Sequence, residues 1–311
     1  MSREKIVSRK LDANETIFFA RELEYVKAKV YEKKYAELKA KSLLPVSTDA
    51  GPAAETITYT QYDQHGVAKI IANYADDLPR VDVSGEQKTS NVRGIGDSYG
   101  FNIQEIRAAN ATGKNLSARK ANAARRGIEQ VENSIAWYGD TAYGLVGLFY
   151  NANVTKGAAV TGDWATATNL EILGDMMAAV DNMIDITNGM EVPNQILLPI
   201  AQYSKISSSP MQAGSDTTVL DFFKKNRPGI EVDWLVNCKD VSPVPSTGAA
   251  GPTDIMVVYK RDIDNLSLEI PQPFEQFPAQ ERGLEQVVDC HARNGGVIVY
   301  YPLSVSIVEG I

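Results

Sequence analysis

The sequence is poor in the residues that usually carry catalytic or metal-binding chemistry. Only two cysteines occur among 311 residues, too few for a disulfide framework or a cysteine-rich zinc site. The motifs H-E-x-x-H and C-x-x-C do not occur, and no phosphate-binding P-loop sequence is present. We therefore predict that the protein is not an enzyme and has no catalytic, cofactor-binding or metal site.

Long apolar runs are also missing. No run approaches the ~18 apolar residues that a membrane-spanning helix needs. The N-terminal sequence MSREKIVSRK is charged and lacks the apolar centre of a secretory signal. We expect no membrane partner and a reduced, intracellular setting.

The few candidates for chemistry have plainer interpretations. Cys290 and His291 are adjacent in a predicted strand, so their side chains point to opposite faces and do not serve one site. A nucleophile pair of a cysteine with His65 stays open. Two acid pairs lie in predicted loops, where carboxylates are commonly solvated: Asp76 with Asp77, and Asp262 with Asp264.

The net charge of −8 is unevenly distributed. Residues 1–41 hold 11 basic and 7 acidic residues, and residues 107–126 hold six basic residues and no acidic one. Residues 127–311, in contrast, hold 10 basic and 23 acidic residues. Opposite charges on different copies of the chain would attract one another; a solvated, unevenly charged surface is the alternative. Aromatic residues do not interleave with the basic ones, which argues against sequence-specific nucleic-acid recognition and leaves nonspecific contact open.

Two long amphipathic helices are predicted. The first covers residues 14–41, with an apolar face of Phe19, Leu23, Val26 and Val30, and it packs either on its own domain or on a neighbouring copy. The second begins at the N-cap Ser117 and ends before Gly139. Its narrow apolar stripe contains Ala121, Ala124, Ile128, Val131 and Ile135. Its polar sides carry Arg119, Lys120, Arg125 and Arg126.

Between the two helices the chain is extended. Residues 55–63, ETITYTQYD, have the Thr, Ile and Tyr content of a strand, and alternation returns at residues 81–83 and 99–103. Few large apolar residues are available for burial, and a two-stranded loop of this kind is marginal alone. It makes sense if it lies across another subunit.

The remaining chain alternates helices and strands. The sequence TNLE at residues 168–171 predicts a capping box that opens a helix ending at Gly189. Strands are predicted at residues 195–199, 230–237, 254–260 and 265–270. Asn294-Gly295-Gly296 indicates a hairpin, and Pro302 indicates that the last strand is an edge or carries a bulge. The predicted class is α+β.

This order of elements resembles the major capsid proteins of tailed phages with the Hong Kong 97-type fold. The resemblance is strongest from GVAKIIANYADDLPRVDV through EIRAANATGKNLSARKANAARRGIEQVENSIAWYGDTAYGLVGL. It continues through QILLPIAQYSKI and HARNGGVIVYYPLSVSIVEG and covers nearly the whole chain. It implies an N-terminal arm (residues 1–52), an extended β-hairpin loop (53–106), a peripheral domain with a long spine helix (107–150 and 266–311) and an axial domain (151–265).

The resemblance also implies a function and partners. The protein is expected to self-assemble, as pentamers and hexamers, into an icosahedral head shell around double-stranded DNA. It would assemble in the host cytoplasm and become part of the virion capsid. Scaffold, portal and decoration proteins are implied as partners, with nonspecific contact to the packaged DNA. The basic residues and the apolar face of the first helix would then face neighbours or the lumen. An encapsulin-type nanocompartment shell and a cytoplasmic α/β enzyme are the alternatives.

Overall fold

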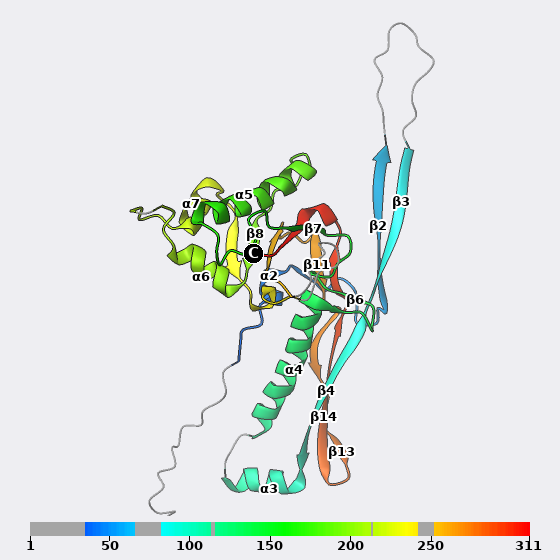
Figure 1. Ribbon diagram of the computed structural model, residues 1–311. Helices are drawn as coiled ribbons and strands as arrows, with labels where there is room; N and C mark the ends of the chain where they lie inside the picture. The colour runs from blue at the N-terminus through cyan, green and yellow to red at the C-terminus, as the bar shows by residue number, and fades with distance from the viewer. Residues whose placement is uncertain (1–34, 66–81, 113–115, 213, 242–251) are drawn as a thin grey trace, which may run out of the picture. The chain divides into compact units, whose positions relative to one another are not determined.

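The computed structural model describes residues 35–65, 82–112, 116–212, 214–241 and 252–311. The chain divides into two compact units, Met1–Glu37 and Leu38–Ile311, and the elements described below belong to the second. That unit mixes helices with both antiparallel and parallel strands, which confirms the predicted α+β class (Figure 1).

Five strands form the largest sheet. Their order is β7 (Thr155–Ala158), β16 (Val305–Glu309), β10 (Ile255–Tyr259), β8 (Gln195–Leu198) and β9 (Glu231–Trp234). β10 runs antiparallel to both of its neighbours, whereas β7 and β9 run parallel to theirs. β8 and β10 are buried at every residue, as expected for strands that are covered on both faces.

Alternate side chains of this sheet enter two different cores. Ile196, Met256 and Val258 pack with three helices, α5 (Asn169–Ile186), α6 (Ile200–Ser208) and α7 (Val219–Asn226). Leu197 and Val257 point to the opposite face and join the second core. The sheet therefore joins the helical layer to the rest of the unit.

The predicted capping box of α5 is present. The Thr168 side chain accepts from the Glu171 backbone N–H, and the Glu171 carboxylate accepts from the Thr168 N–H at 2.8 Å. The Thr168 hydroxyl, at 2.7 Å, and the Thr168 N–H both donate to the Glu171 carboxylate and lower the pKa of Glu171, so its contribution to stability is present above the ordinary carboxyl pKa and is lost on acidification. After the helix, Gly189 has a φ of +79°, as predicted for a helix end.

The second core lies around a three-stranded sheet of β1 (Val46–Ser47), β11 (Leu266–Glu269) and β15 (Gly296–Val299). The short helix α2 (Ala40–Leu43) and the strands β5 (Gly139–Asp140) and β6 (Leu145–Val146) border it. Trp137, at the end of the spine helix, is fully buried and stacks on Phe149 with ring centroids 5.4 Å apart. This aromatic pair fixes the end of the helix against the sheets.

The spine helix α4 (Leu116–Tyr138) lies along β4 (Arg93–Asn102) and β14 (Glu285–Asn294) (Figure 1). Its Ala124 and Ile128 pack on Cys290 and Ala292 of β14. The other edge of β14 pairs with β12 (Gln272–Gln276) and β13 (Gln280–Arg282). Helix α3 (Ile103–Thr112) follows β4.

The predicted extended region is a two-stranded ribbon. β2 (Thr56–His65) pairs antiparallel with β3 (Asp82–Asn91) in unbroken register, from Thr56 opposite Asn91 to His65 opposite Asp82. The residues between the two strands lie outside the described part of the chain. The polar, glycine-containing residues 85–100 also lie almost entirely in strands, because β3 and β4 together cover nearly all of them.

Three sequence predictions need correction. Val131 is 45 % exposed and Glu132 is buried, because the packed face of α4 continues from Ala124 and Ile128 at four-residue spacing through Glu132 to Ala136. Asn294 and Gly296 do not join a hairpin: β14 pairs with β4, β12 and β13, whereas β15 pairs with β11. Gly296, with a φ of +74°, carries the chain from one sheet to the other.

Pro302 lies in the 3₁₀ turn η2 (Pro302–Ser304), so β16 loses no ladder bond and is an inner strand.

The first predicted helix is only partly testable. Residues 14–34, with Phe19, Leu23, Val26 and Val30, lie outside the described residues. Residues 35–39 are not helical, and α2 begins at Ala40. The reason is tertiary: the Ala40 N–H donates to Asn133 Oδ1 of α4 at 3.1 Å, so a side chain from a distant helix caps the new start.

Candidate assembly surfaces

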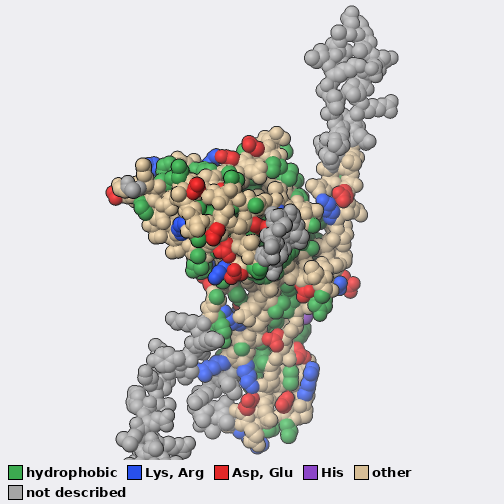
Figure 2. All heavy atoms as spheres, viewed as in Figure 1, with side chains coloured by type: hydrophobic (Ala, Val, Ile, Leu, Met, Phe, Trp, Pro, Cys, Tyr) green, Lys and Arg blue, Asp and Glu red, His purple; other side chains and the backbone are tan. Residues whose placement is uncertain are grey.

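The predicted basic residues lie on one helix but differ in their surroundings. Figure 2 shows Lys and Arg side chains, with acidic ones beside them, in the lower part of the view, where Figure 1 places the first turns of α4. Arg119 and Arg125 are exposed, whereas Lys120 and Arg126 are half-buried. Arg125 Nε pairs with Glu129 Oε1 at 2.9 Å within the helix. An exposed pair of this type stabilises a helix by only about 0.3–0.5 kcal/mol.

Lys120 links α4 to the neighbouring elements of its own chain. Its ammonium donates to Gly100 O at 2.7 Å and to Glu105 Oε2 at 2.8 Å, and it lies 4.8 Å from the Phe101 ring centroid. Lys120 also lowers the pKa of Glu105, first through this hydrogen bond. Three partners from β4 and α3 thus engage a residue that was predicted to face a neighbour or the lumen.

Residues 39–43 form the root of the N-terminal segment and are held at several points. Lys39 pairs with Asp233 Oδ1 at 3.0 Å, and its ammonium lies 3.7 Å from the Trp234 ring centroid. Lys41 pairs with Glu132 Oε2 of the spine helix at 2.6 Å. Tyr259 donates to the Leu43 carbonyl at 2.8 Å, and burial raises the pKa of this tyrosine. Ion pairs and hydrogen bonds therefore hold residues 39–43 in place.

The base of the β2–β3 ribbon is held by few contacts. Tyr59 meets Tyr300 edge to face, with ring centroids 5.1 Å apart, and Ser90 Oγ donates to Gly295 O at 3.2 Å. Between these two contacts, Thr58 and Thr89 share a cross-strand hydrogen bond on an exposed face. A ribbon with so little apolar burial has surface available for other contacts.

Sequence reasoning missed several exposed apolar side chains. Val160 is 90 % exposed and Met190 is 77 % exposed; Leu170, Leu284 and Tyr62 are also largely exposed. They lie in loops, at a helix start and on the ribbon, where periodicity does not separate buried from exposed positions. Such side chains are candidates for burial between copies.

The described residues do not assemble the chemistry of an active site. Burial raises the pKa of the Cys290 thiol, and Asp97 and Asp289 raise it further, which is the opposite of what activates a cysteine nucleophile. Cys290 and His291 do point to opposite faces, as the burial of alternate residues in β14 shows. The side chain of His65, and Asp76 with Asp77, lie outside the described residues. No three His, Cys, Asp or Glu side chains among the described residues gather as metal ligands. No helix in the described part of the chain is both long and apolar enough to span a bilayer.

The described residues thus combine a long helix on a sheet, a two-stranded ribbon and a separate sheet-and-helix region. Solved structures with this fold include the capsid of Myoviridae phage XM1, with a TM-score of 0.81 and 17 % identity, covering 94 % of this chain and 98 % of that one. The chain is also similar to Mycobacterium phage Bobi, with a TM-score of 0.64, 11 % identity and coverage of 96 % and 99 %. A virus-like particle from Pyrococcus furiosus matches with a TM-score of 0.56 and 14 % identity, covering 86 % and 91 %.

The sequence itself matches the family model of major capsid proteins over residues 66–311. The chain belongs to this family, and its fold is the Hong Kong 97-type fold of tailed-phage capsid proteins, as predicted. No curated protein matches the chain significantly by sequence. The role of the protein is structural: it is a subunit of a capsid shell built from many copies.

Proposed function

We propose that this chain forms the icosahedral head shell of a tailed phage around double-stranded DNA, from pentamers and hexamers assembled in the host cytoplasm. The match to the major capsid protein family over residues 66–311 carries the proposal. We further propose that the protein has no enzymatic activity. Besides further copies, its proposed partners are scaffold, portal and decoration proteins and the packaged DNA, which is contacted nonspecifically.

The division into regions is part of the same proposal. Residues 1–52 form the arm, 53–106 the extended loop, 107–150 with 266–311 the peripheral domain, and 151–265 the axial domain. The ribbon of β2 and β3 belongs to the second region, and α5, α6 and α7 belong to the fourth. The exposed apolar residues Tyr62, Met190 and Leu284 occur in three different regions, so contacts between copies can be distributed over the whole subunit.

Shell formation tests the proposal directly. The purified chain is expected to form closed shells, tubes or capsomer rings, measured by light scattering and negative-stain electron microscopy. The contents of shells made in infected cells separate a DNA-filled capsid from the encapsulin-type alternative. A chain that stays monomeric both alone and with the other head proteins of its phage would contradict the proposal.

The basic face of α4 provides a second prediction. We propose that Arg119, Lys120, Arg125 and Arg126, with the apolar residues Phe19, Leu23, Val26 and Val30, face neighbouring subunits or the lumen. The double substitution R125E/R126E reverses two charges and is expected to reduce the yield of closed shells about tenfold, because attraction to acidic surfaces becomes repulsion. Sedimentation of shells measures the yield.

A matched control reverses the same charge elsewhere. Lys224 and Lys225 are exposed neighbours on α7, and K224E/K225E changes the net charge equally. We expect a much smaller loss of shells from this control. Equal yields from R125E/R126E and the unsubstituted chain would show that the face is only solvated.

A further inference from the structure

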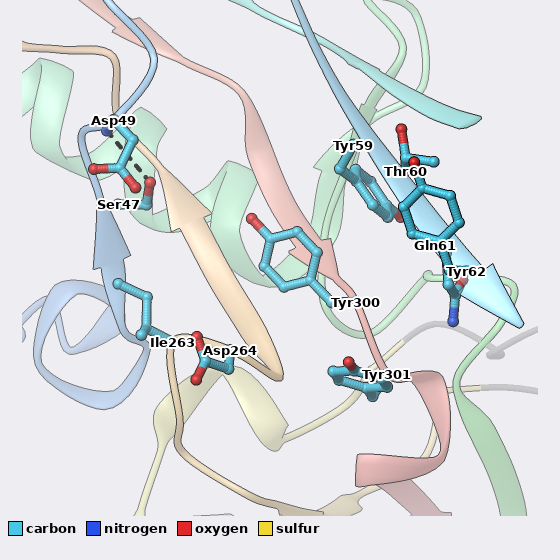
Figure 3. Close-up of a pocket in the computed structure, with 10 residues that line it drawn as sticks. All are labelled: Ser47, Asp49, Tyr59, Thr60, Gln61, Tyr62, Ile263, Asp264, Tyr300 and Tyr301. Atoms are coloured by element: carbon cyan, nitrogen blue, oxygen red, sulfur yellow. Dashed lines mark hydrogen bonds between the residues drawn. The ribbon is translucent and has the colours of Figure 1, made fainter. Parts of the chain in front are cut away.

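Tyrosines and aspartates line an open pocket of about 680 Å³ between the base of the ribbon and the loops beside β11 and β15. Tyr59 and Tyr62 come from β2, and Tyr300 and Tyr301 follow β15; the Tyr59 and Tyr300 rings meet edge to face, and Figure 3 shows all four among the lining residues. The remaining lining residues are Ser47, Asp49, Thr60, Gln61, Ile263 and Asp264. The pocket therefore combines aromatic rings with carboxylates, and its lining contains no lysine or arginine.

The charge of this pocket is not neutralised within the described part of the chain. Asp49 and Asp264 are both exposed, and neither forms an ion pair with a described lysine or arginine. Behind the lining, Tyr300 hydrogen-bonds to the buried Glu269 at 3.3 Å. Burial raises the pKa of Tyr300, and the charge of Glu269 raises it further. The local field therefore favours a cation.

One cation lies near the rim, and it already has partners. Lys88 of β3 donates to Gln61 Oε1 at 3.1 Å and lies 4.0 Å from Glu86 Oε2. A second hollow of about 410 Å³ shares Gln61 and Tyr62 with the pocket and also includes Glu86. Glu86 thus adds one carboxylate on the ribbon, beside Lys88.

The aromatic rings are as available as the carboxylates. Tyr62 is 70 % exposed and Tyr301 is 50 % exposed. A lysine or arginine side chain over a tyrosine face gains a cation–π contact, and its charged end can reach a carboxylate at the same time. Tyrosine faces beside unpaired aspartates therefore suit a basic peptide segment better than an apolar one.

We propose that this pocket binds lysine and arginine side chains from residues 1–10 of a second copy of the chain. Charge complementarity selects this segment, because its ten residues include four basic ones and a single acidic one. The basic residues of α4 are weaker candidates, since Lys120 and Arg125 already pair with Glu105 and Glu129. The inference rests on the proposed assembly of copies and names one contact within it.

Binding of a labelled peptide tests the site apart from shell formation. The peptide MSREKIVSRK is titrated with the full chain by fluorescence anisotropy, at a chain concentration where light scattering shows unassembled protein. We expect saturable binding that weakens with salt, and about tenfold weaker binding to D49N/D264N, because two partly exposed ion pairs are lost. The control D185N/E231Q removes two exposed carboxylates elsewhere and should bind as tightly as the unsubstituted chain.

A charge-reversed variant distinguishes a loss of charge complementarity from a loss of folding. D49K/D264K should no longer bind the basic peptide and should instead bind the peptide MSEEEIVSEE, in which the basic residues are replaced by glutamates. Equal weakening by D49N/D264N and D185N/E231Q, or no binding at all, would overturn the inference. Shells formed by a chain that does not bind the peptide would leave the proposed function standing and remove only this contact.

Cross-linking identifies which copy supplies the segment. Chains carrying R9C are mixed with differently tagged chains carrying D264C and are oxidised during assembly; the two native cysteines are buried. A disulfide joining the two tags supports a second copy as donor. A chain that carries both substitutions and forms the bond only within itself would overturn that part of the inference.

Discussion

K41M is expected to lower the free energy of unfolding by about 3 kcal/mol. Glu132 is 1 % exposed, and within the described residues its carboxylate oxygens have Lys41 as their ion-pair partner and no separate hydrogen bond. Removing one member of such a pair leaves a buried charge uncompensated, which typically costs 3–5 kcal/mol. The Lys41 side chain is 45 % exposed, so water can approach the carboxylate and the cost should fall at the lower end.

Two further variants separate this effect from general surface changes. K41M/E132M removes both charges and should recover most of the lost stability, because no isolated charge remains. K239M breaks the exposed pair of Lys239 with Asp240, 3.7 Å apart, and should cost less than about 0.5 kcal/mol. Urea unfolding at one fixed chain concentration measures all three, since assembly would shift the apparent stability. A loss of under about 1 kcal/mol for K41M would contradict the prediction.

G147A is expected to destabilise the subunit by at least about 3 kcal/mol. A Cβ at this position would lie 2.7 Å from the Trp137 carbonyl oxygen and closer still to backbone atoms of Tyr138 and Gly139. These contacts are with backbone, so no side chain can rotate away to relieve them. The site is where the chain after β6 passes the end of α4, with Leu148 N donating to Ala136 O at 2.9 Å.

A second glycine provides the control for this prediction. Gly157 in β7 has open space around a built Cβ, with no atom within 4 Å. G157A should change the stability by no more than about 0.5 kcal/mol. Thermal or urea unfolding compares the two variants. Similar stabilities for G147A and G157A would show that the backbone near Trp137 can move apart at little cost.

Local sequence signals predicted the local structure well. The capping box at Thr168 and Glu171 forms as predicted because both partners lie within one helical turn. Gly139 and Gly189 end their helices with positive φ, and the β2 strand follows from its Thr, Ile and Tyr content. The order of these elements along the chain was enough to indicate the capsid fold, because that order can be read from local signals without knowing which elements pack together.

Predictions that depended on distant partners failed or were incomplete. Asn294-Gly295-Gly296 has the composition of a hairpin turn, but which strand pairs with β14 is decided by β4, nearly 200 residues earlier in the chain. The first helix was predicted to continue to residue 41, yet Asn133 caps a new start at Ala40. Val131 fits the apolar stripe as well as its neighbours do, and only the packing of α4 exposes it.

The sequence by itself determined the capping box that opens α5, the glycines that follow α4 and α5, which residues are apolar, and where positive and negative charges concentrate. These properties depend on neighbours a few residues apart. The tertiary structure alone decided that Lys120 binds Glu105 and Gly100, that Lys41 neutralises a buried Glu132, and that tyrosines and aspartates from four separate segments meet in one pocket. Each of these contacts joins residues whose distance in space is set by strand pairing and helix packing, and no local pattern encodes that distance.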